Sequence, residues 1–314
     1  MTDIVGVLRA AGESTRLRLL ALLADGEHSV KDLTEILGQS QPRVSRHLKL
    51  LADAGLVERH AEGAWAYYRI APSGAGSELA HWLAARIEPG SGPLALDRRR
   101  QAEIRAAQQE EAAAYFAGIA RDWDQWRALH VPEVAVEAAI VAEIDGPARD
   151  TVIDLGTGSG RMLELLAGRY RHGLGLDSSR EMLAVARARL AGAGLTHARV
   201  RHADIADLDP GIGPADLVLL HQVLHYFDDP GRILAQAARL LAPGGEILVV
   251  DFAPHAHEFL REKHAHRRLG LSRAQMRGWA GAAGLSEASY RDFPPADGAG
   301  LTVCLWRLVP SDRK

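Results

Sequence analysis

The chain has few cysteines, few aromatic side chains and no long apolar run, and each shortage excludes a class of protein. Its one cysteine, Cys304, excludes a disulfide framework and any metal site made from two cysteines of one chain. No apolar run reaches the roughly 18 residues that a membrane-spanning helix needs. The first residues, MTDIVGVLRAAGES, include Asp3 and lack the apolar segment of a signal peptide. We therefore expect a soluble cytoplasmic protein with no membrane partner.

The chain also lacks an excess of positive charge, because 37 Lys and Arg stand against 40 Asp and Glu. A net charge of −3 creates no overall field that would attract nucleic acid, so any contact with DNA needs a local basic patch. The length of 314 residues is enough for two domains, each with its own core.

The first feature that indicates chemistry is the stretch TVIDLGTGSGR, residues 151–161. Apolar and β-branched residues lead into a turn that contains Gly156, Gly158 and Gly160, and a helix is expected from about Arg161. Glycine lets a ligand approach the backbone closely, and the free N–H groups at the start of a helix would point back at the turn. Strand, glycine turn and helix are typical of a nucleotide-binding unit. A glycine-rich turn without a ligand is the alternative.

Two carboxylates follow at the ends of the next expected strands. Asp177 closes the run GLGLD, 17 residues after Gly160, where an acidic residue can accept hydrogen bonds from ribose hydroxyls. Asp204 follows the run VRHA. With the alternation of one acidic residue and three glycines from Asp154 to Gly160, this part of the chain resembles motif I of the class I S-adenosylmethionine (SAM) methyltransferases.

The resemblance implies a pocket for SAM or S-adenosylhomocysteine (SAH). Asp154 and the glycine backbone would hold the amino and carboxylate ends of the ligand, and Asp204 would read its adenine amino group. Tyr115 and Trp123, in a segment similar to the cap of small-molecule methyltransferases, would cover the sulfonium or else pack in the core. The expected cofactor-binding residues are Asp154, Gly156, Thr157, Gly158, Gly160, Asp177, Ser178, Ala203, Asp204, Ile205, His221, Tyr115 and Trp123.

The N-terminal region has the pattern of several short helices followed by a hairpin. Apolar residues recur at helical spacing in 15–25 and 30–37, and Ser40 and Pro42 open a further helix. In that helix Val44, Leu48 and Leu51 would face inward. Residues 39–51 contain three Lys or Arg and no acidic residue, which fits a face placed on phosphates and base edges. Residues 55–60 and 65–70 alternate like two strands.

The run SQPRVSRHLKLLADAGLVERHAEGAWAYYRI resembles the ArsR/SmtB family of winged-helix repressors, and the resemblance covers most of residues 5–87. It implies a homodimer that binds double-stranded operator DNA through the third helix and the wing. Residues 29–33 and 76–81 lack the family's metal-ligand patterns, so no metal is expected. A domain that only dimerises, with a solvated basic face, is the alternative. The expected DNA-binding residues are Ser40, Gln41, Arg43, Ser45, Arg46, His47, Arg59 and Arg69.

We expect a winged helix-turn-helix domain at 1–88, a linker, connecting helix and cap at 89–130, and a methyltransferase-like domain at 131–314. The charge-rich residues 97–111 predict a solvated connecting helix. The expected fold class is α/β plus α+β, in which the winged helix-turn-helix precedes a doubly wound, Rossmann-like sheet. The seven expected strands are 151–155, 173–177, 198–202, 215–221, 246–252, 286–293 and 301–308.

His221 lies just past the end of an expected strand, where ligands bind in open α/β sheets. It is the candidate catalytic base, or else it packs against the cofactor. The stretch that follows lacks the Asn/Asp-Pro-Pro-aromatic motif of DNA amino-methyltransferases, which argues against a nucleobase substrate. On a helix, Glu258, Glu262 and His266 would share one face, as a metal site, as a polar lid over the substrate cavity or as a contact with the connecting helix.

The two regions together resemble SAH-responsive ArsR-type regulators. This resemblance implies a dimeric transcriptional regulator, a repressor of methionine and SAM-cycle genes, with SAM or SAH as effector. The alternative is an active SAM-dependent methyltransferase for a small molecule, with the helix-turn-helix serving autoregulation. Methyl transfer from SAM needs little from a protein beyond positioning, so the sequence alone does not separate the two.

Overall fold

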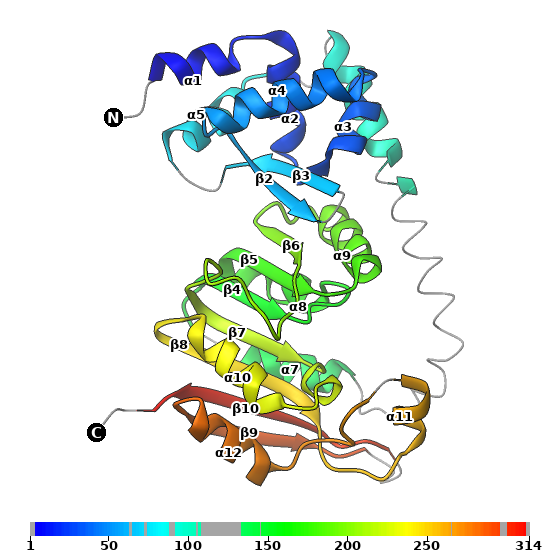
Figure 1. The fold of residues 1–314 in the computed structure, drawn as a ribbon, viewed down its shortest axis with the longest axis vertical. Helices are drawn as coiled ribbons and strands as arrows, with labels where there is room; N and C mark the ends of the chain where they lie inside the picture. The colour runs from blue at the N-terminus through cyan, green and yellow to red at the C-terminus, as the bar shows by residue number, and fades with distance from the viewer. Residues whose placement is uncertain are drawn as a thin grey trace. The chain divides into compact units, whose positions relative to one another are not determined.

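A computed structural model describes residues 4–62, 65–71, 74–87, 92–104, 106–107, 133–144, 146–264, 266–295 and 300–311. The chain forms two compact units (Figure 1). The first contains the described residues up to 107 together with 190–196, and the second contains the described residues 133–189 and 197–311. No helix in these described ranges is long and apolar enough to cross a membrane.

The N-terminal unit is a winged helix-turn-helix, as predicted. Its elements are α1 (Ile4–Ala11), α2 (Ser14–Leu23), β1 (His28–Ser29), α3 (Val30–Leu37), α4 (Gln41–Asp53), β2 (Val57–Glu62), β3 (Trp65–Ile70) and α5 (Ala75–Ala84). The strands β2 and β3 form the antiparallel hairpin of the wing, and the two-residue strand β1, which the sequence did not indicate, pairs with β3 on its other edge.

Local sequence explains where the two helices of the helix-turn-helix begin and end. The Ser29 hydroxyl accepts a hydrogen bond from the Asp32 N–H, and the Asp32 carboxylate accepts one from the Ser29 N–H, so a capping box starts α3. Gly38 ends α3 with φ +61°, a left-handed conformation that favours glycine. Ser40 stands at the N-cap of α4 as predicted, but its side chain makes no capping hydrogen bond.

The core of this unit lies beneath α4. Val44, Leu48 and Leu51 are fully buried, which confirms the predicted inward face of the helix. They belong to one apolar cluster with residues of α1, α2, α3, the wing and α5.

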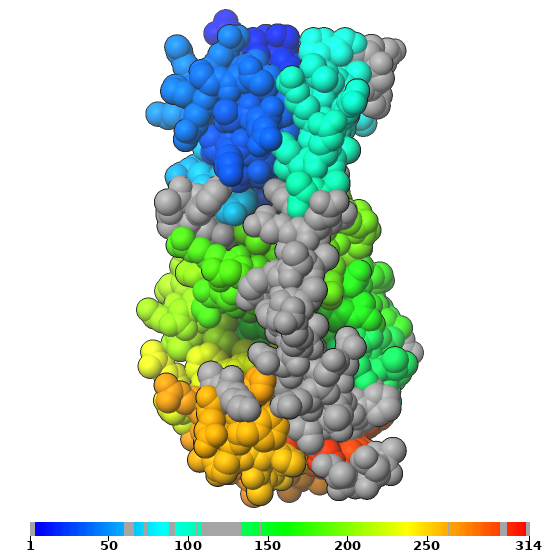
Figure 2. Space-filling view, turned by 90° about the vertical axis from the view of Figure 1, so that its right-hand side faces the viewer, coloured from blue at the N-terminus to red at the C-terminus, as the bar shows by residue number. Residues whose placement is uncertain are grey.

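A helix at residues 92–104, called the linker helix below, also belongs to the N-terminal unit. Figure 2 shows it in turquoise against the blue residues of the helix-turn-helix. The expectation of a solvated connecting helix was wrong for this segment, because Asp97 is completely buried and Gln101 is 3% exposed. Asp97, Arg100 and Gln101 find partners on α2, α3 and β1, respectively. Arg99 and Glu103, on the other face of the helix, remain exposed.

The second unit contains a seven-stranded sheet in the order β6-β5-β4-β7-β8-β10-β9. The pairs from β6 to β8 are parallel and β10 runs antiparallel to both neighbours, so the predicted doubly wound sheet is confirmed. The strands are β4 (Arg149–Leu155), β5 (Tyr170–Asp177), β6 (Ala198–His202), β7 (Ala215–His221), β8 (Leu241–Phe252), β9 (Leu285–Phe293) and β10 (Val303–Pro310).

Helices cover both faces of this sheet, with α10 and α12 over one face and α7 over the other (Figure 1). Their apolar residues meet a sheet whose central strands are almost wholly apolar, which is typical of a parallel sheet buried on both sides. The helices are α7 (Glu133–Glu143), α8 (Arg161–Leu165), η1 (Ala167–Arg169), α9 (Arg180–Gly192), η2 (Leu224–Tyr226), α10 (Pro230–Arg239), α11 (Phe259–His264) and α12 (Arg273–Ala282).

The histidine-rich segment after β8 differs from its prediction. The helix α11 ends at His264, so Glu258, Glu262 and His266 do not share one helical face. Glu258 forms an exposed ion pair with Arg261, whereas His266 is buried. In the described part of the chain, no group of three or more His, Cys, Asp or Glu is arranged to hold a metal ion.

Candidate functional site

The glycine turn after β4 is shaped by close packing as well as by backbone conformation. Gly156 has φ +72° and a Cβ there would collide with the Val223 side chain, so no other residue fits. The N–H groups of Gly156 and Thr157 both donate to the Leu176 carbonyl, at 2.8 and 2.9 Å, and tie the turn to the end of β5. Gly160, with φ +75°, then starts α8. The turn is therefore held at the carboxyl edge of the sheet, where α/β folds bind ligands.

Asp154 is a buried carboxylate, and one of its two oxygens accepts no hydrogen bond from the described residues. The Thr157 hydroxyl donates to its Oδ2 at 2.7 Å, while Oδ1 is buried and has no hydrogen-bond partner among the described residues. Burial, with the Asp177 carboxylate nearby, raises the pKa of Asp154 to about 7. A buried acceptor without a donor is costly. An ammonium group bound beside Asp154, such as that of SAM or SAH, would satisfy it, so the residues present fit this ligand.

Asp177 and Asp204 lie at neighbouring strand ends, as the sequence predicted. The Asp177 carboxylate accepts hydrogen bonds from the Gly158 and Ser179 N–H groups, both at 2.8 Å, and it remains partly exposed. The exposed Asp204 carboxylate accepts one from the Ala206 N–H at 2.9 Å. Both side chains are held by backbone donors and keep oxygen lone pairs for a ligand.

The other expected cofactor residues lie in the same region, with two exceptions. Ser178 is exposed, the Ala203 N–H donates to the Asp177 carbonyl at 2.9 Å, and Ile205 is buried. Tyr115 and Trp123 lie outside the described residues, so their expected contact with the sulfonium stays a prediction.

His221 ends β7 beside the glycine turn, since the neighbouring Leu220 pairs with Leu155. Burial lowers the pKa of His221 to about 4. The imidazole is therefore neutral near pH 7 and can pack against a ligand, whereas a pKa this low makes it a weak proton acceptor. Both predicted roles stay open.

A second histidine, His225, forms a buried pair with a carboxylate, Asp251, and the sequence analysis did not identify this pair. His225 Nδ1 lies 2.7 Å from Asp251 Oδ1, with both side chains essentially buried, and its Nε2 has no hydrogen-bond partner among the described residues. The His266 ring stacks on it with centroids 4.0 Å apart. Burial alone would raise the pKa of Asp251, but its interactions with His225 and the hydrogen bond from the Phe252 N–H hold it below its ordinary value. A histidine oriented by a buried carboxylate is an arrangement that proton-transferring sites use.

In the N-terminal unit, α4 presents a basic exposed face. Ser40, Gln41, Arg43 and Arg46 are exposed, and Ser45 is half-buried. His47 differs from these, because its side chain is 14% exposed and its Nδ1 lies 3.5 Å from a Glu13 carboxylate oxygen. Burial lowers the pKa of His47.

The two wing arginines have different surroundings. Arg59 is exposed. Arg69 faces Glu58 across the hairpin, and its Nη2 lies 2.5 Å from the Glu58 carboxylate. Arg69 is therefore paired with Glu58, whereas the exposed Arg59 interacts with the Tyr68 hydroxyl.

Comparisons with known proteins match both units. Residues 152–245 match the family model of the methyltransferase domain, and residues 13–59 match that of bacterial regulatory proteins of the arsR family.

One similar relative is the trans-aconitate 2-methyltransferase of Methylobacterium nodulans, which is 34% identical over 196 residues, 60% of this chain and 72% of the relative. Another is the arsenic resistance transcriptional regulator ArsR1 of Pseudomonas putida, which is 37% identical over 83 residues; the match spans 26% of this chain and 61% of the relative's length. The fold of an S-adenosylmethionine-dependent methyltransferase from Clostridium acetobutylicum is similar, with a TM-score of 0.50 and 14% identity over 62% of this chain and 99% of that one.

Proposed function

From the premise that this chain belongs to the methyltransferase family and carries an arsR-family DNA-binding domain, we propose that it is a transcriptional regulator whose methyltransferase-like domain binds SAM or SAH as the effector. In this proposal the protein is a repressor of methionine and SAM-cycle genes. The ligand shifts it between states that differ in affinity for the operator.

The observation that carries the proposal is the way in which the linker helix is built into the DNA-binding unit. Gln101 Nε2 lies 2.8 Å from His28 Nε2, and the Arg100 guanidinium donates to the Ile36 carbonyl at 3.2 Å. Ile36 belongs to α3, two residues before Gly38, which ends that helix ahead of α4. The segment that leads to the effector domain therefore contacts the helix that positions the reading helix. We therefore expect a displacement of the linker helix to shift α3 and, through α3, α4.

The proposed homodimer has a candidate surface in the same unit. Ile4, Val5 and Leu8 on α1 and Trp82 on α5 are each about half exposed. Exposed large apolar side chains are typical of surfaces that a partner subunit covers.

The arsenic-related name of the ArsR1 relative does not lead to a proposal for this chain. Soft ions such as arsenite are held by several thiolates. The chain has one cysteine, Cys304, which is 1% exposed, and burial raises the pKa of its thiol. A nucleoside ligand at Asp154 and Asp177 is the better-supported effector.

The test is operator affinity at fixed salt with SAM, with SAH and with neither. We expect one ligand, SAH by preference, to change operator affinity by at least about fivefold, within the usual coupling range of 1–3 kcal/mol. Linkage requires operator DNA to change SAH affinity by the same factor. Equal operator affinity in all three conditions would reject the sensor proposal.

A second candidate function is methyl transfer to a small molecule. The His225–Asp251 pair favours it, because a buried carboxylate that orients a histidine suits an acceptor that must lose a proton. Incubation of the protein with SAM labelled at its methyl group and a cell extract tests this candidate. Transferred label that is lost in His225→Gln would support the enzyme, and absence of any transfer would count against it.

A further inference from the structure

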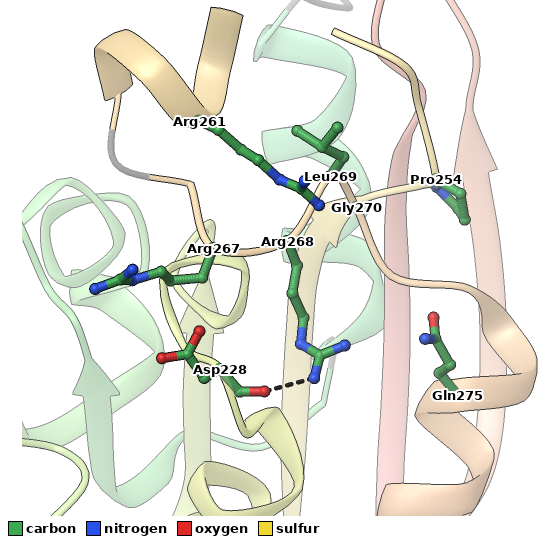
Figure 3. A pocket seen from close by; sticks show the side chains of 8 residues that line it. All are labelled: Asp228, Pro254, Arg261, Arg267, Arg268, Leu269, Gly270 and Gln275. Atoms are coloured by element: carbon green, nitrogen blue, oxygen red, sulfur yellow. Dashed lines mark hydrogen bonds between the residues drawn. The ribbon is translucent and has the colours of Figure 1, made fainter. Parts of the chain in front are cut away.

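A pocket of about 490 Å³ lies in the second unit, among residues that follow β7 and β8 and at the start of α12 (Figure 3). Its charged lining consists of the guanidinium groups of Arg261, Arg267 and Arg268 and the carboxylate of Asp228. Three cations thus line the pocket with one anion, in a chain whose net charge is negative.

The backbone that carries these arginines is firmly held. The N–H groups of Arg267 and Arg268 both donate to the His225 carbonyl at 3.0 Å, and the Leu271 N–H donates to the Phe252 carbonyl at 2.8 Å. Gly270 has φ +81°, and a Cβ there would collide with the Ala253 carbonyl. The loop is therefore fixed against the carboxyl ends of β7 and β8, the edge of the sheet where ligands bind.

The two arginines that enter the pocket come from different elements. Figure 3 shows Arg261 reaching in from α11 and Arg268 from the loop, whereas Arg267 points away from both. The Arg268 guanidinium donates to the Asp228 carbonyl and lies 5.3 Å from the centroid of the Trp279 ring. Its Nε is buried and has no hydrogen-bond partner among the described residues. The Arg268 guanidinium is thus held in position by a hydrogen bond and a ring contact while it lines the pocket.

The charges already near these groups do not neutralise them. The Arg261 guanidinium lies 3.6 Å from Glu258, but both side chains are at least half exposed, and such surface pairs are weak. The Asp228 side chain is exposed, so water and salt screen its charge.

We propose that this pocket binds a small organic anion with two or more carboxylate groups, as a second ligand beside the nucleoside. The guanidinium fork matches the two oxygens of a carboxylate. Pro254 and Leu269 line the same pocket and offer apolar contact to the carbon skeleton between two carboxylates, and the Gln275 amide offers a further polar contact. This ligand goes beyond the proposed SAM or SAH effector, whose site is at the glycine turn.

Calorimetry on the full chain at low salt tests the proposal with citrate, inorganic pyrophosphate and acetate as probes. We expect citrate to bind with an affinity of about millimolar or tighter and acetate to give no measurable binding. Pyrophosphate binding as tightly as citrate would overturn the preference for a carboxylate. No citrate binding to the wild type would overturn the site.

Three variants locate the binding. Arg268→Gln should weaken citrate binding by about tenfold or more, and the exposed Arg261→Gln, which leaves the loop intact, by about fivefold. The control is Arg277→Gln, because Arg277 lies on α12 outside the pocket and pairs with Glu287. Citrate affinity unchanged in Arg261→Gln and Arg268→Gln would refute the pocket. SAH affinity, measured in parallel, should stay at the wild-type value in all three, so loss of SAH binding would bear on the effector proposal alone.

Discussion

Arg18 on α2 and Asp97 on the linker helix form a two-point ion pair. Arg18 Nε lies 2.5 Å from Asp97 Oδ2 and Arg18 Nη2 lies 2.6 Å from Asp97 Oδ1, and the carboxylate is fully buried. The two residues are 79 positions apart in the chain. This pair fastens the linker helix to the DNA-binding unit, and the hydrogen bond to Asp97 raises the pKa of Arg18.

Asp97→Ala should destabilise the N-terminal unit by about 2 kcal/mol. The change leaves Arg18 without its partner, and breaking a buried pair is costly, although Arg18 keeps some contact with water. Hydrogen exchange on the full chain should show faster opening of α2 and α3. The control is Glu103→Ala, which removes the exposed partner of Arg99 and should change opening by less than about 0.5 kcal/mol. Unchanged exchange in Asp97→Ala would mean that the helix is not held by this pair.

Asp177→Ala should weaken SAM and SAH binding by about 2 kcal/mol or more, because the ribose hydroxyls lose a charged acceptor. Since Asp177 also accepts hydrogen bonds from the backbone of Gly158 and Ser179, Asp177→Asn serves as the milder variant. Asp292→Ala removes an exposed carboxylate on β9 and is the control. Calorimetry that finds near-normal affinity in folded Asp177→Ala would refute the ribose assignment. Operator binding should survive in all three.

Arg43→Ala and Arg46→Ala should weaken operator binding and leave SAH affinity unchanged. Both side chains are exposed on α4. Loss of an arginine that reads a base edge should cost about 1–3 kcal/mol of binding free energy and relax specificity at that base pair. Loss of an arginine that contacts phosphate should weaken binding to all sequences and flatten its salt dependence. Arg99→Ala, on the linker helix, is the matched control. If both α4 variants bound the operator like the wild type, α4 would not be the reading helix.

SAH affinity should fall as the pH falls through 7. The pKa of ligand-free Asp154 is about 7, and only the ionised carboxylate attracts the ligand's ammonium group. Between pH 8 and pH 6 the ionised fraction falls about tenfold, and the dissociation constant should rise by a similar factor. Calorimetry at the two pH values measures this change. Asp154→Asn should bind weakly at both, and a pH dependence that persists in that variant would assign the titration to another group.

The Asp154 carboxylate should affect the pH dependence of folding stability in the direction opposite to its effect on SAH affinity. Its pKa is raised in the folded protein from an ordinary value of 3.8, so the ligand-free fold binds a proton more tightly than the unfolded chain. This contribution is fully present below about pH 4 and is lost as the pH rises through 7. SAH should therefore raise the melting temperature more at pH 8 than at pH 6.

The elements that the sequence predicted are those whose signals are local. The glycine turn, the carboxylates Asp177 and Asp204 at strand ends, and the inward face of α4 all follow from spacings within one strand–turn–helix unit or one helix. Apolar periodicity and glycine placement act over a few residues, so they can be read without knowledge of the fold. For the same reason, seven strands were expected in the second unit, and its described residues form a sheet of seven.

Tertiary structure alone decided which distant polar groups meet. The charged residues 97–101 have the composition of a solvated helix, yet Asp97 is buried because Arg18 is there to pair with it. His225 and Asp251 lie 26 positions apart, and only the parallel pairing of β7 with β8 brings the two strand ends together. A buried polar side chain is stable only when a partner satisfies it, and the partner is supplied by the fold, not by the neighbouring sequence.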